Sequence, residues 1–185
     1  PSWLQVDPEF YRHGGHSFGP GEMLALAEAK GERALVYPAS GGEEALSLAN
    51  LGATVSVFDS LENSARARAL AEQAGIAVTF LEGVPGSPEI PGGPYDTVYS
   101  SFGLLSALEF FDDWAGGIAG ALKTGGRLVI HDVHPAAYVP GVRKGVFAVA
   151  HSYFDDEEDG GGPGWTMGDL ISALGMAGMP TIYLE

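Results

Sequence analysis

The 185-residue chain contains no cysteine, which excludes disulfide bonds, thiolate ligands to a metal and a cysteine nucleophile. It also lacks any run of about 18 or more apolar residues, the length that a membrane-spanning helix requires. The first residues, "PSWLQVDPEFYRHGG", have neither the basic start nor the apolar middle of a secretory signal. We therefore expect a cytoplasmic protein with no membrane partner.

Basic residues are scarce, with 9 Lys and Arg against 24 Asp and Glu, so the net charge is -15. That charge repels a phosphate backbone, and we expect no nucleic acid partner. The acidic run 155–159, "DDEED", leads into a glycine-rich stretch and is typical of a solvated loop. Contiguous acids do not have the alternating ligand spacing of a calcium-binding loop.

With 45% hydrophobic residues, a chain of this length can bury the core of one domain. Short apolar runs predict strands at 34–37, 54–58, 77–81, 96–100 and 127–133. Helical patterns lie between them at 43–51, 62–74 and 108–122, and Gly75 supplies a left-handed helix end. The proline-rich and glycine-rich segment 82–94 excludes a regular helix. This alternation predicts an α/β fold with a doubly wound, mostly parallel sheet flanked by helices.

Ligands of such sheets bind beyond the carboxyl ends of the strands, so the residues that follow each strand are the candidates. After the first strand, the loop 38–42, "PASGG", opens a helix whose N-terminus offers free N–H donors. Gly41 and Gly42 permit a sharp turn and a close approach of ligand to backbone. Asp59 follows the second strand, where a carboxylate can accept hydrogen bonds from both hydroxyls of a ribose. The pattern indicates a site for a nucleotide-type cofactor.

Three stretches resemble motifs of class I S-adenosylmethionine-dependent methyltransferases that act on small molecules. They are "RALVYPASGGEEALSLANLGATVSVFD", "YDTVYSSFGLLSALE" and "ALKTGGRLVIHDVHP". The resemblance implies a Rossmann-like class I methyltransferase fold, S-adenosylmethionine as the cofactor and a small-molecule acceptor. It also implies which residues contact the cofactor. The ribose is expected at Asp59, and the methionine end lies beside Ser100 and Ser101. The methionine part runs along Pro38, Ala39, Ser40, Gly41 and Gly42, and the adenine lies near Ser60, Leu61, Gly83 and Val84.

The flanks extend the resemblance to nearly the whole chain, which we treat as one methyltransferase-like domain. The resemblance implies an N-terminal cover segment at 1–32, a cofactor-binding core at 33–135, and an acceptor-side insertion with a late helix and strand at 136–185. The family sheet finishes with two strands after the last helix, whereas "MPTIYLE" suffices for one. Either the sheet lacks its last strand or an earlier segment such as "GVFAVAH" replaces it.

The first motif departs from the family pattern. Val36 stands where an acid is common, Pro38 and Ser40 replace loop glycines, and Val84 replaces an adenine-binding Asp. Losing a charged hydrogen bond costs about 1.5–3 kcal/mol, so two losses weaken binding by roughly two to four orders of magnitude.

Two hypotheses follow: an S-adenosylmethionine-dependent methyltransferase, hence an enzyme, or a protein of this fold that has lost methyl transfer and binds a ligand or partner. An NAD-dependent oxidoreductase is disfavoured because Pro38 and Ser40 impede the approach of a pyrophosphate.

Methyl transfer to a hydroxyl-type acceptor needs a general base. His134 follows the fifth strand, at the expected rim of the pocket, and is our candidate catalytic residue. His131, Asp132 and His134 are metal-ligand types, but their spacing also belongs to an ordinary strand ending, so we predict no metal.

Aromatic residues allow two interpretations. For the aromatic residues near the N-terminus, two roles are equally consistent with the sequence: walls of an acceptor pocket, or contacts within the core. These residues are Trp3, Phe10, Tyr11 and Phe18. Helical spacing favours packing for Phe110, Phe111 and Trp114, whereas Trp165 either opens the late helix or flanks the acceptor pocket.

Overall fold

The computed structural model describes residues 6–84, 86–100, 102–108, 110–143, 146–149, 153–154 and 164–184. Its helices are α1 (Pro8–Arg12), α2 (Pro20–Leu26), α3 (Glu43–Asn50), α4 (Ala65–Ala74), η2 (Leu105–Ala107), α5 (Phe111–Ala121), η3 (Pro135–Tyr138) and α6 (Met167–Met176). Its strands are β1 (Arg33–Val36), β2 (Thr54–Asp59), β3 (Thr79–Glu82), β4 (Tyr95–Ser100), β5 (Leu122–Ile130), β6 (Pro140–Arg143) and β7 (Val146–Val149). Within these described ranges, no helix is long and apolar enough to cross a membrane.

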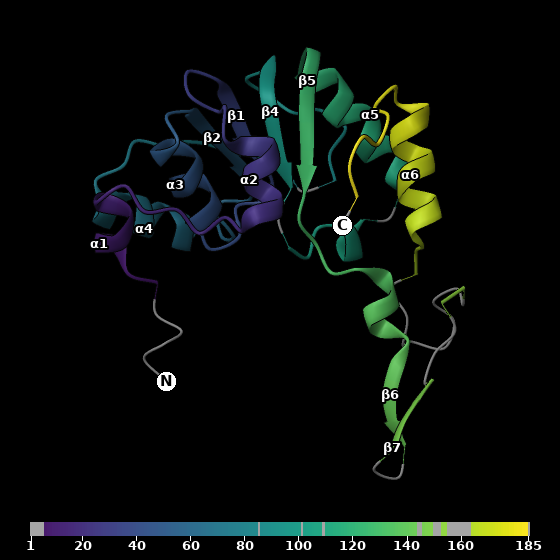
Figure 1. Cartoon of the computed structure of the whole chain (residues 1–185). Helices are drawn as coiled ribbons and strands as arrows, with labels where there is room; N and C mark the ends of the chain where they lie inside the picture. The colour runs from purple at the N-terminus through teal and green to yellow at the C-terminus, as the bar shows by residue number, and fades with distance from the viewer. Residues whose placement is uncertain are drawn as a thin grey trace.

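A five-stranded parallel sheet in the order β3-β2-β1-β4-β5 forms the centre of the fold (Figure 1). Val36 of β1 lies in register with Val57 of β2 and with Tyr99 of β4. The strand order therefore reverses at β1, and ligands of doubly wound sheets bind at this reversal, beyond the carboxyl ends of the strands. The predicted α/β sheet is confirmed.

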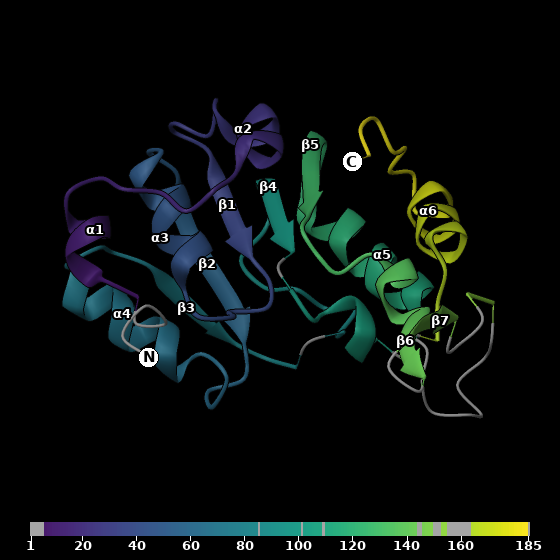
Figure 2. The ribbon, with the colours of Figure 1, turned by 60° about the horizontal axis from the view of Figure 1, so that its bottom comes forward.

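Helices cover both faces of the sheet, with α3 and α4 on one face and α5 and α6 on the other (Figure 2). Ala34 and Val36 belong to the buried cluster on the α3 and α4 face, whereas Leu35 and Tyr37 belong to the cluster on the α5 and α6 face. Neighbouring residues of a strand point to opposite faces. Both sets are buried here, so the strands read as continuous apolar runs.

Several element boundaries differ from the predicted ones. Gly75 ends α4 in the predicted left-handed conformation, with φ 70°, but α4 begins at Ala65 rather than at 62. The segment "KTGG" belongs to β5 instead of ending the preceding helix. The reason is that Leu122 already pairs with Tyr95, and the register shifts before Arg127 pairs with Thr97.

The predicted strand near the C-terminus is wrong for its described residues. Residues 179–184 form no strand, and Ile182 is 92% exposed. The proposed replacement is also wrong, because β7 pairs antiparallel with β6 in a separate two-stranded sheet that projects away from the main one (Figure 1). As far as the chain is described, the main sheet ends at β5, so the expectation of a missing last strand holds. The acidic run 155–159 lies outside the described residues.

Candidate cofactor site

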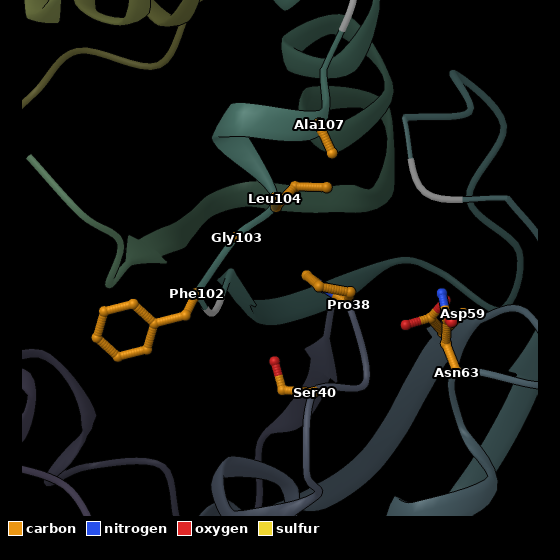
Figure 3. Close-up of a pocket in the computed structure, with 8 residues that line it drawn as sticks. All are labelled: Pro38, Ser40, Asp59, Asn63, Phe102, Gly103, Leu104 and Ala107. Carbon is orange, nitrogen blue, oxygen red and sulfur yellow. The ribbon is translucent and has the colours of Figure 1, made fainter. Parts of the chain in front are cut away.

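A cavity of about 360 Å³ opens at the carboxyl ends of β1, β2 and β4 (Figure 3). Its lining residues come from the loop after β1, the end of β2 and the segment after β4, and they are Pro38, Ser40, Asp59, Asn63, Phe102, Gly103, Leu104 and Ala107. Pockets for small ligands and cofactors have volumes of roughly 300–1,000 Å³. Pro38 lies in the middle of the wall, with Asp59 and Asn63 to one side of it and Phe102 to the other (Figure 3).

Asp59, the last residue of β2, is held by three hydrogen bonds. Its Oδ2 accepts from the amide of Ala39 at 2.9 Å, and its Oδ1 accepts from the amide of Ser60 at 2.7 Å and from Asn63 Nδ2 at 2.9 Å. A carboxylate has roughly four acceptor positions, so part of this capacity is left for a ligand hydroxyl. Because Asp59 is only 2% exposed, a ligand reaches it over a small part of its surface.

The loop after β1 owes its shape to two residues with positive φ. Ser40 has φ 44° and Gly42 has φ 96°. A Cβ on Gly42 would lie 2.8 Å from the Cα of Ala67 in α4, whereas one on Gly41 would meet the flexible side chain of Glu43. Gly42 is therefore required by the packing of the loop against α4, in addition to the turn. Sequence reasoning assigned this glycine to the sharp turn and to ligand approach, and it missed the packing against α4.

The N-terminus of α3 carries negative charge beside the cavity. Glu43 and Glu44 lie in its first turn, and Glu43 pairs with Arg66 at 2.8 Å. Glu44 Oε2 is buried without a hydrogen-bond partner among the described residues. Burial raises the pKa of Glu44, and repulsion from Glu43 and Glu22 adds to the rise, against a backbone hydrogen bond that lowers it. These carboxylates offset the positive end of the helix dipole. A phosphate at this end of α3 would therefore meet carboxylates rather than an open helix terminus.

The predicted contacts that follow β2 and β3 divide into three groups. Ser60 and Leu61 follow Asp59 in the turn before α4, and Leu61 is exposed. Val84 lies in the wall of a second cavity of about 320 Å³, which shares Ala107 with the first. A Cβ on Gly83 would lie 2.1 Å from the ring of Phe58, so this glycine makes room for a core side chain.

The end of β4 is partly described. Ser100 is fully buried, and its Oγ has no hydrogen-bond partner within the described part of the chain. Ser101 lies outside the described residues. Asp132, after β5, accepts from the amides of Gly103 at 3.0 Å and of Leu105 at 3.1 Å. Asp132 therefore fixes the cavity wall that follows β4.

Sequence reasoning missed several wall residues. Asn63 lies four residues after Asp59 and contacts its carboxylate. The sequence shows this spacing, but many pairs of polar residues have the same spacing and do not touch. Leu104 and Ala107 follow β4 and carry no polar chemistry, so no pattern singles them out. His134 caps η3, since its Nδ1 accepts from the amide of Ala136 at 3.1 Å. Its catalytic role stays a prediction.

The aromatic side chains are mainly structural. Tyr11 and Phe18 are buried in the core on the α3 and α4 face, and Trp114 is fully buried as predicted. The predicted packing role is wrong for Phe110, whose side chain is 62% exposed. Trp165 precedes α6 and contacts Phe111, with ring centroids 5.6 Å apart. Phe10 is exposed, and Trp3 lies outside the described residues.

A parallel sheet in the order β3-β2-β1-β4-β5, covered on both faces and open at its carboxyl edge, is the class I methyltransferase fold. No protein-family model and no curated protein matches the chain. Solved structures do match. An S-adenosylmethionine-dependent methyltransferase from Mesorhizobium loti is 24% identical in sequence and aligns with a TM-score of 0.69. The alignment covers 86% of this chain and 81% of the Mesorhizobium chain.

Two further structures are similar over most of this chain. A protein of Bacillus halodurans assigned as a methyltransferase is 20% identical with a TM-score of 0.64, covering 85% of this chain and 67% of its own. A protein of Galdieria sulphuraria assigned as a sarcosine dimethylglycine methyltransferase is 18% identical with a TM-score of 0.65, covering 94% and 73%. Two others are longer, and the chain spans 50% and 54% of them. At these identities the likeness establishes the fold.

Proposed function

We propose that this chain transfers a methyl group from S-adenosylmethionine to a small-molecule acceptor. The observation that carries the proposal is the position of Asp59, whose carboxylate lines the cavity at the reversal of strand order. The solved methyltransferases of the same fold support S-adenosylmethionine as the cofactor. They give no support to the alternative of a binding module without transfer.

The charges of the site suit this cofactor. S-adenosylmethionine supplies a methyl group on a positively charged sulfur. The eight lining residues include one carboxylate, Asp59, and no basic side chain. Glu43 and Glu44 add negative charge just beyond Ser40. A pyrophosphate would meet repulsion here, which is a further reason to disfavour a dinucleotide.

The residues of the chain then have distinct roles. In this proposal Asp59 and Asn63 hold the ribose, and Pro38 and Ser40 line the path of the amino-acid part. Phe102 and Leu104 form an apolar wall that excludes water beside the transferred group. Fixing both partners in one cavity supplies much of the acceleration in a reaction of this kind.

A small-molecule acceptor is supported by the limited cavity volume and by the net charge of -15, which opposes nucleic acid. The Galdieria protein carries the name sarcosine dimethylglycine methyltransferase, and small amines of this kind offer a starting class for acceptor screens. The cytoplasmic location and the division into cover, core and acceptor segments remain predictions.

Isothermal titration with S-adenosylhomocysteine tests the proposal. We expect saturable binding, weakened about 10–100-fold in Asp59→Asn because a charged hydrogen bond is lost. Asp112→Asn, on the exposed first turn of α5, is the matched control and leaves the affinity unchanged. NADH fluorescence should not increase. Absence of binding at millimolar ligand overturns the proposal, and binding without transfer to any tested acceptor favours the binding-module alternative.

A further inference from the structure

His131, just after β5, belongs to a polar cluster at the edge of the site. Its Nδ1 lies 3.3 Å from Glu22 Oε1 and 3.4 Å from the hydroxyl of Tyr99. Glu22 comes from α2 and Tyr99 from β4, so three elements far apart in the sequence meet here. Its ring packs on Phe102, with centroids 4.4 Å apart, and Phe102 lines the cavity.

The hydrogen bonds of this cluster determine which nitrogen of His131 carries the proton. The hydroxyl of Tyr99 donates to Glu22 Oε1 at 2.5 Å, so its proton is already committed. Burial raises the pKa of Tyr99, and the hydrogen bond to Glu22 raises it further, which keeps the hydroxyl protonated. Both oxygens near Nδ1 are therefore acceptors, and Nδ1 must be the donor. In the neutral imidazole, Nε2 then carries the free lone pair.

Glu22 is itself held in place. Its Oε2 accepts from the amide of Gly19 at 2.8 Å and so caps α2, while only 15% of its side chain is exposed. The side chain of His131 is 45% exposed, so an acceptor can approach the ring. A base oriented by a fixed carboxylate is the arrangement that general-base sites use. His134 has the opposite arrangement, since its Nδ1 accepts a backbone N–H.

We propose that His131, positioned by Glu22, accepts the proton of a hydroxyl or amine acceptor during methyl transfer. The inference rests on the proposed function. As the acceptor oxygen or nitrogen forms its bond to the methyl carbon, the carbon–sulfur bond breaks and its electron pair stays on sulfur. The proton of the acceptor moves to the lone pair of Nε2. The carboxylate of Glu22, 3.3 Å from Nδ1, then lies opposite the positive charge that forms on the ring.

The tautomer of His131 can be measured without any acceptor. Long-range ¹H–¹⁵N spectra of the imidazoles should give the Nδ1–H tautomer for His131 and the Nε2–H tautomer for His134. Glu22→Ala should shift His131 toward Nε2–H, whereas Tyr99→Phe, which leaves the carboxylate in place, should retain Nδ1–H. An Nε2–H tautomer in the wild-type protein overturns the proposal, whichever acceptor is used.

Transfer assays supply the second test, with 4-nitrocatechol as the hydroxyl probe and sarcosine as the amine probe. His131→Asn keeps a donor near Glu22 but removes Nε2, and we expect kcat to fall about 10²-fold or more while S-adenosylhomocysteine binds as before. His13→Asn, on the exposed end of α1, is the matched control. If His131→Asn transfers methyl groups as fast as the wild-type protein, the proposal is overturned. It is also overturned if the loss of kcat appears in His134→Asn and not in His131→Asn. Failure of the wild-type protein to bind S-adenosylhomocysteine overturns the proposed function instead, and the proton-acceptor role with it.

Discussion

The carboxylate of Asp59 and the backbone amide of Ala39 are joined by a hydrogen bond of 2.9 Å. This bond ties the end of β2 to the loop that follows β1, beside the point where the strand order reverses. The acid that the sequence marks as a ribose ligand therefore also builds the wall of the site. Its structural role and its proposed role in ribose binding are separable, because the first affects the unfolding of the free protein and the second affects only ligand binding.

Asp59→Asn should lower the free energy of unfolding by about 1.5–3 kcal/mol, since hydrogen bonds to a charged acceptor are lost in a buried position. Urea denaturation at pH 7 measures this change. Asn63→Ala removes only one of the three partners and should cost less. Equal stability of the wild-type protein and Asp59→Asn would contradict the structural role of the carboxylate.

Gly42→Ala should destabilise the protein by about 1–3 kcal/mol or more, because an L side chain is strained at φ 96° and its Cβ would press on the Cα of Ala67. The control is Gly116→Ala on α5, where a Cβ meets nothing within 4 Å. That substitution should stabilise by roughly 0.5–1 kcal/mol through helix propensity. Thermal unfolding distinguishes the two, and effects of the same sign would refute the packing argument.

Ser40 occupies the left-handed region without being glycine. Ser40→Gly relieves the backbone strain, whereas Ser40→Ala keeps it and loses the hydroxyl. The glycine variant should therefore exceed the alanine variant in unfolding free energy by roughly 1–2 kcal/mol. Chemical denaturation of the two variants measures this difference directly. Identical midpoints would mean that the loop relaxes to another conformation.

Glu44 should make stability depend on pH. Burial raises its pKa above the ordinary value of 4.5, so at pH values between the unfolded and folded pKa the folded state holds a proton that the unfolded state has released. The stabilisation is complete below that ordinary value and is lost as the pH rises through the raised pKa. Glu44→Gln should therefore be more stable than the wild-type protein at pH 7, and the gap should narrow at pH 5.

Denaturation curves at both pH values check this prediction. Glu43→Gln, which breaks only the pair with the mostly exposed Arg66, serves as the control and should change stability by about 0–1 kcal/mol at both pH values. A wild-type protein that is the more stable one at pH 7 would contradict a destabilising burial of the Glu44 carboxylate.

Local chemistry determines how much of the fold and site the sequence could predict. Asp59 and Gly75 were identified because a strand end and a helix end impose their requirements over a few neighbouring residues. The contact of Glu22 with Tyr99 was beyond reach, since 77 positions separate them and only the folded sheet brings them together. The packing role of Gly42 was missed for the same reason, because Ala67 lies on another helix. Ile182 was misassigned to a strand because its apolar neighbours satisfy the pattern with no partner strand beside them.

The central claim is that one cavity, bounded by Pro38, Asp59 and Phe102, receives the adenosyl group. The most direct measurement is a ¹H–¹⁵N correlation spectrum of the labelled protein during titration with S-adenosylhomocysteine. Saturable shifts should appear at the amides of Ala39, Ser60 and Asn63, and Ala148 of the distant β6–β7 hairpin should stay unchanged. A spectrum that does not change, or shifts confined to residues outside the cavity, would contradict the account.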